Sequence, residues 1–211
     1  MFIIFEGANG VGKTTLKNRF TDMPGFKTIF SPGSTPLAAT LRPVCRGTGE
    51  WRGCDSHLQL LAFSTARTDE WLKHVKDCND IVISDRWWTS TYVYQCMLEG
   101  FSPEFLEYTI HRDEVVDRVY IFHADPELLI SRLKQERKEN KDHEICTWTQ
   151  KEETTIKVNE YYRYNLPQFL QHRNISYRLI DVTYLSKDDV FKQVYKDIMQ
   201  LSATNQMDRI P

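Results

Sequence analysis

FIIFEGANGVGKTT, residues 2–15, is the stretch of sequence that decides the fold. It opens with Phe2 to Phe5, a continuous apolar run of β-branched and aromatic residues that is typical of a buried parallel strand. Residues 7–14 then match the pattern G-x-x-x-x-G-K-S/T in full, and we expect a helix from about Gly12. A strand, a glycine-rich turn and a helix form the context in which this pattern binds nucleotide phosphates. The stretch therefore predicts a nucleotide-phosphate site.

Each residue type in this loop has a physical task. The glycines let backbone N–H groups surround a phosphate, and the N-terminus of the following helix adds a favourable dipole. Lys13 can reach the β- and γ-phosphate oxygens, and the Thr14 hydroxyl can bind Mg²⁺. The predicted phosphate-binding residues are Gly7, Asn9, Gly10, Val11, Gly12, Lys13, Thr14 and Thr15.

Apolar runs like the first recur along the chain, at 27–30, 80–84, 119–122 and 176–180. The segments between these runs are long enough for crossover helices. Five strands alternating with helices predict an α/β fold in which a five-stranded parallel sheet is covered by helices on both faces. One domain of this kind, residues 1–211, accounts for the length of the chain.

Composition excludes several classes of protein. The chain has 27 Lys and Arg against 29 Asp and Glu, a net charge of −2, which argues against a protein that coats nucleic acid or anchors to a membrane by basic charge. Five cysteines without a C-x-x-C pair indicate neither a disulfide framework nor a structural metal site. The apolar run at the N-terminus is too short for a signal peptide or a membrane span. We expect a cytoplasmic protein without nucleic-acid or membrane partners.

A carboxylate and an arginine follow the third apolar run. Asp85 and Arg86 come directly after residues 80–84, and the carboxyl ends of parallel strands are where open α/β sheets bind ligands. Asp85 is therefore expected beside the phosphate loop, where it can hold a metal-bound water together with Thr14. Arg86 is expected to face the same crevice.

Four segments, in this order and spacing, resemble one known family. They are FEGANGVGKTT (5–15), PGSTPLAATLR (32–42), LLAFSTAR (60–67) and SDRWWTSTYVYQ (84–95). Over most of its length the sequence resembles thymidylate kinases, the P-loop enzymes that phosphorylate dTMP. The resemblance implies a nucleoside monophosphate kinase fold with a short mobile lid, ATP as donor, Mg²⁺ as cofactor, and a homodimer formed through helices around Ser56–Lys76 and Ser90–Met97.

The resemblance also assigns an acceptor site. Phe63 and Arg67 are four residues apart and so share one helix face, where the ring can stack on a pyrimidine and the guanidinium can donate to its carbonyl oxygen. Arg42 and Arg86 resemble the two arginines that clamp the acceptor phosphate. The further acceptor residues that the resemblance implies are Ser90, Thr91 and Gln95 at the base edge, Tyr94 under the deoxyribose, and Tyr164, which closes the pocket.

The family places a catalytic arginine either in the phosphate loop or in the lid. Gly10 stands at the loop position here, so the cation is expected from a lid at about 134–150 and its neighbourhood, where Arg132, Arg137, Lys138 and Lys141 are available. We choose Arg137, which completes the predicted catalytic set of Lys13, Asp85, Arg86 and Arg137. A polar tail is expected from about 202 to 211.

Three departures from the family pattern leave the acceptor open. Asn9 replaces a usual carboxylate, Phe30-Ser31-Pro32 replaces R-E-P, and Trp87-Trp88 follows Asp85-Arg86 where one smaller aromatic residue is usual. A 5-modified dUMP, or a broader range of deoxynucleoside monophosphates, is therefore an alternative to dTMP. A kinase for a nucleoside hydroxyl or a base in DNA, and a non-catalytic nucleotide-binding module, are further alternatives.

Overall fold

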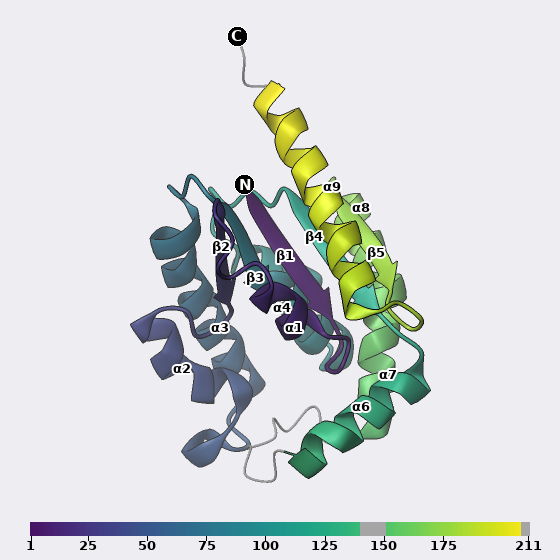
Figure 1. The fold of residues 1–211 in the computed structure, drawn as a ribbon. Coiled ribbons are helices and arrows are strands. Elements are labelled where there is room, and N and C mark those ends of the chain that lie inside the picture. The colour runs from purple at the N-terminus through teal and green to yellow at the C-terminus, as the bar shows by residue number, and fades with distance from the viewer. Residues whose placement is uncertain (140–150, 208–211) are drawn as a thin grey trace.

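Five parallel strands form the centre of the structure, in the order β2-β3-β1-β4-β5 (Figure 1). The structure, a computed structural model, describes residues 1–139 and 151–207, with the side chains of Arg137 and residues 205–207 left out. The strands are β1 (Phe2–Gly7), β2 (Phe26–Phe30), β3 (Ile81–Asp85), β4 (Arg118–His123) and β5 (Tyr177–Asp181). Each strand coincides with one of the five predicted apolar runs, with β3 and β5 shifted by one residue, and the predicted parallel sheet is confirmed.

Strand β1 occupies the middle of the sheet because its side chains are apolar on both faces. All of its residues are buried, and it pairs with β3 on one side and β4 on the other. The edge strands β2 and β5 are less buried, and each has one buried residue, Ile29 in β2 and Ile180 in β5. The register pairs Phe5 with Asp85, so the phosphate loop and Asp85 leave the sheet side by side.

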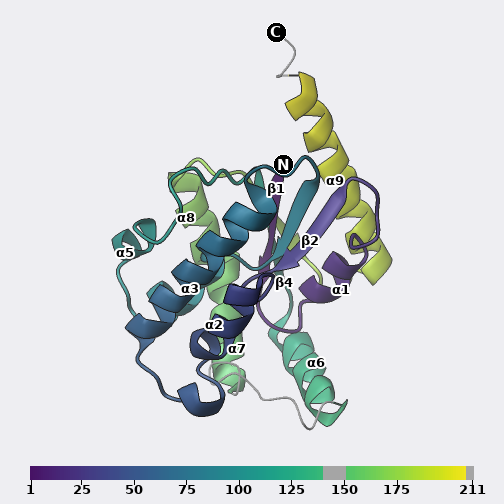
Figure 2. The same ribbon diagram turned by 90° about the vertical axis from the view of Figure 1, so that its left-hand side faces the viewer.

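Helices cover both faces of the sheet, which confirms the predicted fold class (Figures 1 and 2). Helices α1 (Lys13–Asn18) and α9 (Lys187–Met207) lie on one face. The other face carries α3 (Ser56–Glu70) and α8 (Leu166–His172). The remaining helical segments are α2 (Pro36–Arg46), η1 (Gly49–Trp51), η2 (Trp71–Val75), α4 (Trp88–Thr91), η3 (Tyr92–Leu98), α5 (Pro103–Glu107), α6 (Pro126–Glu139), α7 (Glu152–Glu160) and η5 (Tyr161–Asn165).

Side chains at the N-caps of α2 and α3 stabilise the first turns of these two helices. The Thr35 hydroxyl accepts from the backbone N–H of Ala38 at the start of α2, and the Asp55 carboxylate accepts from the first turn of α3. These bonds satisfy N–H groups that have no partner within the helix. Three π-helical turns, η2, η3 and η5, continue or join the helices that cover the α3 face.

Two apolar clusters lie within the described part of the chain. The larger one surrounds the sheet, and in it the Phe5 ring meets Tyr120 and Phe122 edge-on with centroid distances of 5.8 and 5.5 Å. The smaller one, Val44, Cys45 and Ala62, lies between α2 and α3. The contact between α2 and α3 is therefore packed around a small core of its own.

The predicted lid and tail fall at the margins of the described residues. Residues 134–139 form the end of α6, while 140–150, including Lys141, lie outside the described residues. The tail predicted from about 202 continues as part of α9 to Met207, and the last turns project beyond the sheet (Figure 1). Among the described residues, no helix combines the length and apolar character needed to cross a membrane.

Candidate active site

The phosphate loop joins β1 to α1 through three glycines with positive φ. Gly7, Gly10 and Gly12 have φ of 142°, 86° and 95°. At Gly7 a Cβ atom would lie 2.2 Å from the carbonyl oxygen of Phe122 on the neighbouring strand, so a side chain has no room there. Glycine is thus required both for the backbone conformation and for the close approach to β4.

The ammonium of Lys13 lies inside this loop. Its Nζ donates to the carbonyl oxygens of Gly7 and Ala8 at 2.8 and 2.9 Å, and the residue is only 6% exposed. Burial, reinforced by the positive charge of Arg86, lowers the pKa of Lys13 from 10.5 to about 7. A bound phosphate would reverse this shift, because a nearby anion favours the charged ammonium.

Thr14 and Asp85 meet at the carboxyl edge of the sheet. The Thr14 hydroxyl donates to Oδ2 of Asp85 at 2.6 Å, so two hard oxygen ligands lie next to the loop. Within residues 1–139 and 151–207, no group of three or more His, Cys, Asp or Glu side chains could hold a metal ion. Such a sparse oxygen pair fits Mg²⁺, which proteins hold through one or two carboxylates together with substrate phosphates and water.

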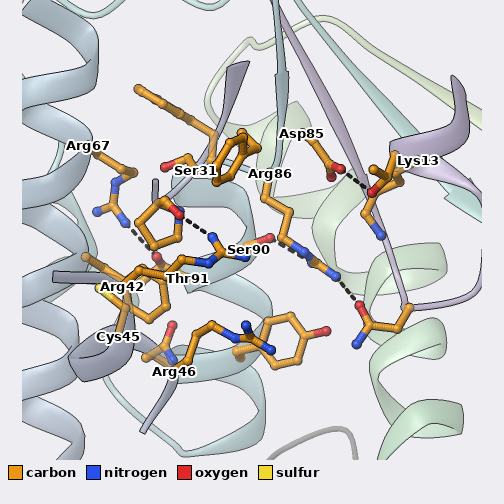
Figure 3. Close-up of a pocket in the computed structure, with 18 residues that line it drawn as sticks. Lys13, Ser31, Arg42, Cys45, Arg46, Arg67, Asp85, Arg86, Ser90 and Thr91 are labelled. Atoms are coloured by element: carbon orange, nitrogen blue, oxygen red, sulfur yellow. Dashed lines mark hydrogen bonds between the residues drawn. The ribbon is translucent and has the colours of Figure 1, made fainter. Parts of the chain in front are cut away.

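A cavity of about 290 Å³ extends from the phosphate loop toward α2 and α3 (Figure 3). Five cationic side chains line it, and Asp85 is its single carboxylate among the described residues. Positive charge of this density repels itself, and it lowers the pKa of Arg42, for which burial is the larger cause and Arg46 the next. The cavity is therefore suited to an anion. Its cations are Lys13, Arg42, Arg46, Arg67 and Arg86.

Arg67 and Phe63 of α3 form one wall of this cavity, as their spacing predicts. Arg67 is 3% exposed, and its guanidinium donates to the hydroxyls of Thr91 (2.8 Å) and Thr109 (3.2 Å). Burial lowers the pKa of Arg67 to about 10, which leaves it charged at neutral pH. Gln95 also lines the cavity, and its buried Nε2 has no hydrogen-bond partner among the described residues. An amide in this state is available to a ligand.

Arg86 lines the cavity and contacts Asn9 of the phosphate loop. Its φ is +70°, an uncommon conformation for a residue with a side chain. Nη2 donates to Oδ1 of Asn9 at 2.6 Å, and Nη1 donates to the hydroxyls of Ser90 and Tyr162 at 3.1 and 3.0 Å. The strand end and the phosphate loop are thus connected through this guanidinium (Figure 3).

Arg42 approaches the same cavity from α2. Its Nη1 donates to the carbonyl oxygen of Pro32, and its guanidinium lies 5.2 Å from the centre of the Phe30 ring. Both contacts place Arg42 at the side of the cavity formed by the Phe30-Ser31-Pro32 segment. Of the predicted acceptor residues, the structure gathers Arg42, Phe63, Arg67, Arg86, Ser90, Thr91, Tyr94 and Gln95 around this one cavity.

Other predicted residues lie elsewhere. Tyr164 is 54% exposed beside Arg163 and is not among the residues that line the cavity, whereas Tyr162, two residues earlier, contacts Arg86. The side chain of Arg137 lies outside the described residues. Arg132, one of its alternatives, donates to the carbonyl oxygen of Gly10 at 3.0 Å and so reaches the phosphate loop. Gly7, Gly10, Val11, Gly12 and Thr15 belong to the loop and the start of α1 without lining the cavity.

Sequence reasoning missed three residues around the cavity. Arg46 lies one helical turn after Arg42, and this spacing could have revealed it. Glu6 is a carboxylate inside an apolar run, which is itself a signal, since charges are rarely buried without partners. Tyr162 lies 156 residues from Glu6 along the chain, and no local pattern connects them.

A phosphate loop at the end of the central strand and a cationic cavity beside it define the class: a P-loop protein with the fold of nucleoside monophosphate kinases. The family model for thymidylate kinase matches residues 5–170. This chain therefore belongs to the thymidylate kinase family.

Individual relatives agree with the family assignment. A thymidylate kinase of Acinetobacter baumannii is 32% identical over 115 residues, which cover 51% of this chain and 58% of that protein, so the matched part spans little more than half of the relative. A thymidylate kinase of Acinetobacter baylyi is 30% identical over 146 residues, covering 64% of this chain and 72% of the relative. A probable thymidylate kinase of Methanococcus maripaludis is 27% identical over 202 residues and 94% of each chain.

Solved structures agree in fold. Thymidylate kinase from Ehrlichia chaffeensis superimposes with a TM-score of 0.66 at 21% identity, covering 94% of this chain and 98% of that one. Thymidylate kinase from Candida albicans gives a TM-score of 0.65 at 17% identity, covering 94% and 91%. At these identities the likeness concerns the fold alone.

Proposed function

We propose that this protein is a Mg²⁺-dependent kinase that transfers the γ-phosphoryl group of ATP to a deoxynucleoside monophosphate, with dTMP as the acceptor, to give dTDP and ADP. The observation that carries the proposal is one continuous cavity that joins Lys13 and Thr14 of the phosphate loop to Phe63 and Arg67 of α3. Donor phosphates and a nucleoside acceptor can meet there without a covalent intermediate. Family membership supports the same reaction.

Phosphoryl transfer depends on positioning and on neutralising the charge of the moving group. In this proposal the loop amides and Lys13 hold the donor phosphates, and Thr14 and Asp85 hold the metal ion. Bound Mg²⁺ supplies neutralisation of charge on the β- and γ-phosphate oxygens. Of the candidate cations, Arg132, Arg137 and Lys138 belong to α6, and Arg132 already contacts the loop.

The acceptor is held by its phosphate and by its base. Arg42 and Arg86 bind the acceptor phosphate, for which a planar fork of donors is better suited than a point charge. Phe63 stacks on the pyrimidine, and Arg67 donates to thymine O4, where cytosine would present an amino donor. Ser90, Thr91 and Gln95 complete the base edge, and Tyr94 packs under the deoxyribose.

A second acceptor class, 5-modified dUMP, is favoured by the lining of the cavity. Trp87 and Arg46 both line it, and Asn9 contributes a neutral amide to its phosphate-loop side. A methyl group in an apolar pocket changes specificity by only about 1–3 kcal/mol, so side chains of this size and charge can shift the preference.

The test is ADP formation from ATP and Mg²⁺ with a panel of acceptors: dTMP, dUMP, 5-hydroxymethyl-dUMP, dCMP, dGMP, UMP and thymidine. We expect dTMP to give the largest signal and Arg67→Ala to lower it strongly. The matched control is Arg112→Ala, because the Arg112 side chain is 91% exposed and is not among the residues that line the cavity.

Each other outcome points to a different function. Preference for 5-hydroxymethyl-dUMP supports the second acceptor class, and preference for thymidine indicates a kinase for nucleoside hydroxyls. ATP binding without acceptor-dependent turnover contradicts the kinase proposal and leaves a nucleotide-binding module.

We also propose a homodimer formed through the outer side of α3 and η2, acting in the cytoplasm without nucleic-acid or membrane partners. Leu58, Leu61 and Leu72 are exposed on these elements, whereas the predicted second contact, Ser90–Met97, is mostly buried within the chain. Light scattering after gel filtration should give twice the 24.9 kDa of one chain, and Leu61→Glu should reduce this to one chain.

A further inference from the structure

Glu6 is a fully buried carboxylate immediately before the phosphate loop. Glu6 is 0% exposed because it lies in the central strand, where every neighbouring side chain is buried. A carboxylate at such a position needs hydrogen-bond donors. Its Oε1 accepts from the backbone N–H of Trp87 at 3.0 Å and from the Thr89 hydroxyl at 2.5 Å. Its Oε2 accepts from the hydroxyls of Ser90 and Tyr162, both at 2.8 Å. A buried carboxylate with four donors is well satisfied.

The direction in which the Ser90 and Tyr162 hydroxyls point their protons determines whether their oxygens can accept hydrogen bonds from Arg86. Ser90 and Tyr162 each have one hydroxyl proton, and both hydroxyls lie within hydrogen-bond distance of Oε2 of Glu6. When both protons go to the carboxylate, the lone pairs of the two oxygens remain free to accept from Nη1 of Arg86, at 3.1 and 3.0 Å. Nη1 itself lies 3.9 Å from Oε2. The carboxylate therefore orients two hydroxyls, and these fix the guanidinium.

The charge distribution around Arg86 follows from this arrangement. The Arg86 guanidinium forms an ion pair with the buried carboxylate of Glu6, whose Oε2 lies 3.9 Å from Nη1. Glu6 supplies its negative charge from the inner side, while Asn9 offers only a neutral carbonyl oxygen on the phosphate-loop side. The guanidinium is thus held firmly without a loop carboxylate that would compete with a phosphate.

We propose that Glu6 and Tyr162 are positioning residues for phosphoryl transfer: through the Ser90 and Tyr162 hydroxyls they hold Arg86 in the orientation that the acceptor phosphate requires. Neither residue lines the cavity, so both act through Arg86. This inference rests on the proposed function, in which Arg86 binds the acceptor phosphate.

The test is a double-mutant cycle of Tyr162→Phe and Arg86→Ala, measured as kcat and as KM for each substrate. Tyr162→Phe removes one oxygen and keeps the buried ring. We expect kcat/KM for the acceptor to fall about 10–100-fold, because small misplacements of a clamping group have effects of this size. The KM for ATP should stay unchanged. In the Arg86→Ala background, Tyr162→Phe should have no further effect, since the group on which it acts is gone.

The matched control is Tyr120→Phe, which removes a hydroxyl that donates to Asp197 at 2.6 Å, away from the cavity. If Tyr162 had a purely structural role, Tyr162→Phe would behave like Tyr120→Phe. Stability would fall, but kcat/KM for the acceptor would not fall relative to the KM for ATP. Glu6→Gln is a second test variant, which is combined with Arg86→Ala in the same way. Should it fail to fold, Tyr162→Phe still decides the question.

Three results would overturn the inference. Wild-type-like kinetics of Tyr162→Phe, or equal effects of this substitution with and without Arg86, exclude a role through Arg86 and leave the proposed function intact. A wild-type protein without acceptor-dependent turnover refutes the proposed function, and the inference with it.

Discussion

Replacing Lys13 with methionine should abolish phosphoryl transfer and at the same time stabilise the folded protein. The Lys13 ammonium is 6% exposed, and burial lowers its pKa from 10.5 to about 7. A base with a lowered pKa binds fewer protons in the folded state than in the unfolded chain, so stability rises with pH between about 7 and 10.5. The charge therefore penalises folding most at pH 7 and below.

The size of the effect follows from the shift and from the bonds that are lost. The difference between 10.5 and about 7, at about 1.4 kcal/mol per pKa unit, sets an upper bound of about 5 kcal/mol. Methionine gives up two hydrogen bonds to the carbonyls of Gly7 and Ala8, worth about 0.5–1.5 kcal/mol each. We expect a net gain of about 1–3 kcal/mol at pH 7, or about 2–10 °C in Tm for a chain of this length.

Urea and thermal unfolding at pH 7 and pH 9.5 measure this gain, and ADP formation measures activity. At the higher pH the gain should disappear or become a small loss, because the folded Lys13 side chain is then a neutral amine and the free energy needed to deprotonate it is about 3 kcal/mol lower than at pH 7. Lys192→Met, an exposed substitution on α9, is the matched control and should change neither stability nor activity. A Lys13→Met protein that is less stable than wild type at pH 7, or whose difference is the same at both pH values, would refute the reasoning.

Three further substitutions test other parts of the site. Gly7→Ala should destabilise the protein by more than about 3 kcal/mol, because strain at positive φ adds to a contact of 2.2 Å between the new Cβ atom and the Phe122 carbonyl oxygen. Thermal unfolding measures this loss. The control is Gly25→Ala, which should cause a much smaller loss because Gly25 has a φ of +79° and open space around its Cβ position. Burial raises the pKa of Glu114 to about 7, so the folded state binds more protons than the unfolded chain between pH 4.5 and 7, and stability falls as the pH rises through this range. Glu114→Gln removes the buried charge. In urea unfolding it should therefore stabilise the protein by about 1–2 kcal/mol at pH 8 and have no effect at pH 4. Asp85→Asn should raise the Mg²⁺ concentration that gives half-maximal ADP formation at least about 10-fold with little change in Tm, and an unchanged Mg²⁺ titration would contradict the assignment of Asp85 as a metal ligand.

The sheet and the phosphate loop could be predicted because their signals are local. A strand that is buried on both faces must be largely apolar, and the inner strands β1, β3 and β4 show this pattern, whereas the edge strands β2 and β5 have shorter apolar runs. The glycines of the phosphate loop can also be recognised in the sequence, because the loop backbone requires glycine: Gly7, for example, has no room for a side chain. Arg42, Phe63 and Arg67 were found through helical spacing and family resemblance, and the structure places them around one cavity.

What the sequence did not reveal depends on contacts between distant segments. The resemblance points to Tyr164, whereas in the structure Tyr162 contacts Arg86. Both tyrosines lie in the π-helical turn η5, and a widened turn changes which side chains share a face. The partners of Glu6 come from two segments more than 80 and 150 residues away. The predicted tail continues α9 because Val190, Val194 and Ile198 keep an apolar stripe at four-residue spacing, and the polar residues after it can simply extend the helix.

The separate packing of α2 and α3 has a consequence for how this protein can evolve. Val44, Cys45 and Ala62 form a cluster apart from the one around the sheet, and Arg42, Arg46, Phe63 and Arg67 extend from the same two helices. In the proposed function this helical pair reads the nucleobase, so a substitution there would change the acceptor while the central strands and the phosphate loop keep their packing. Acceptor preference can therefore drift between lineages at little risk to folding.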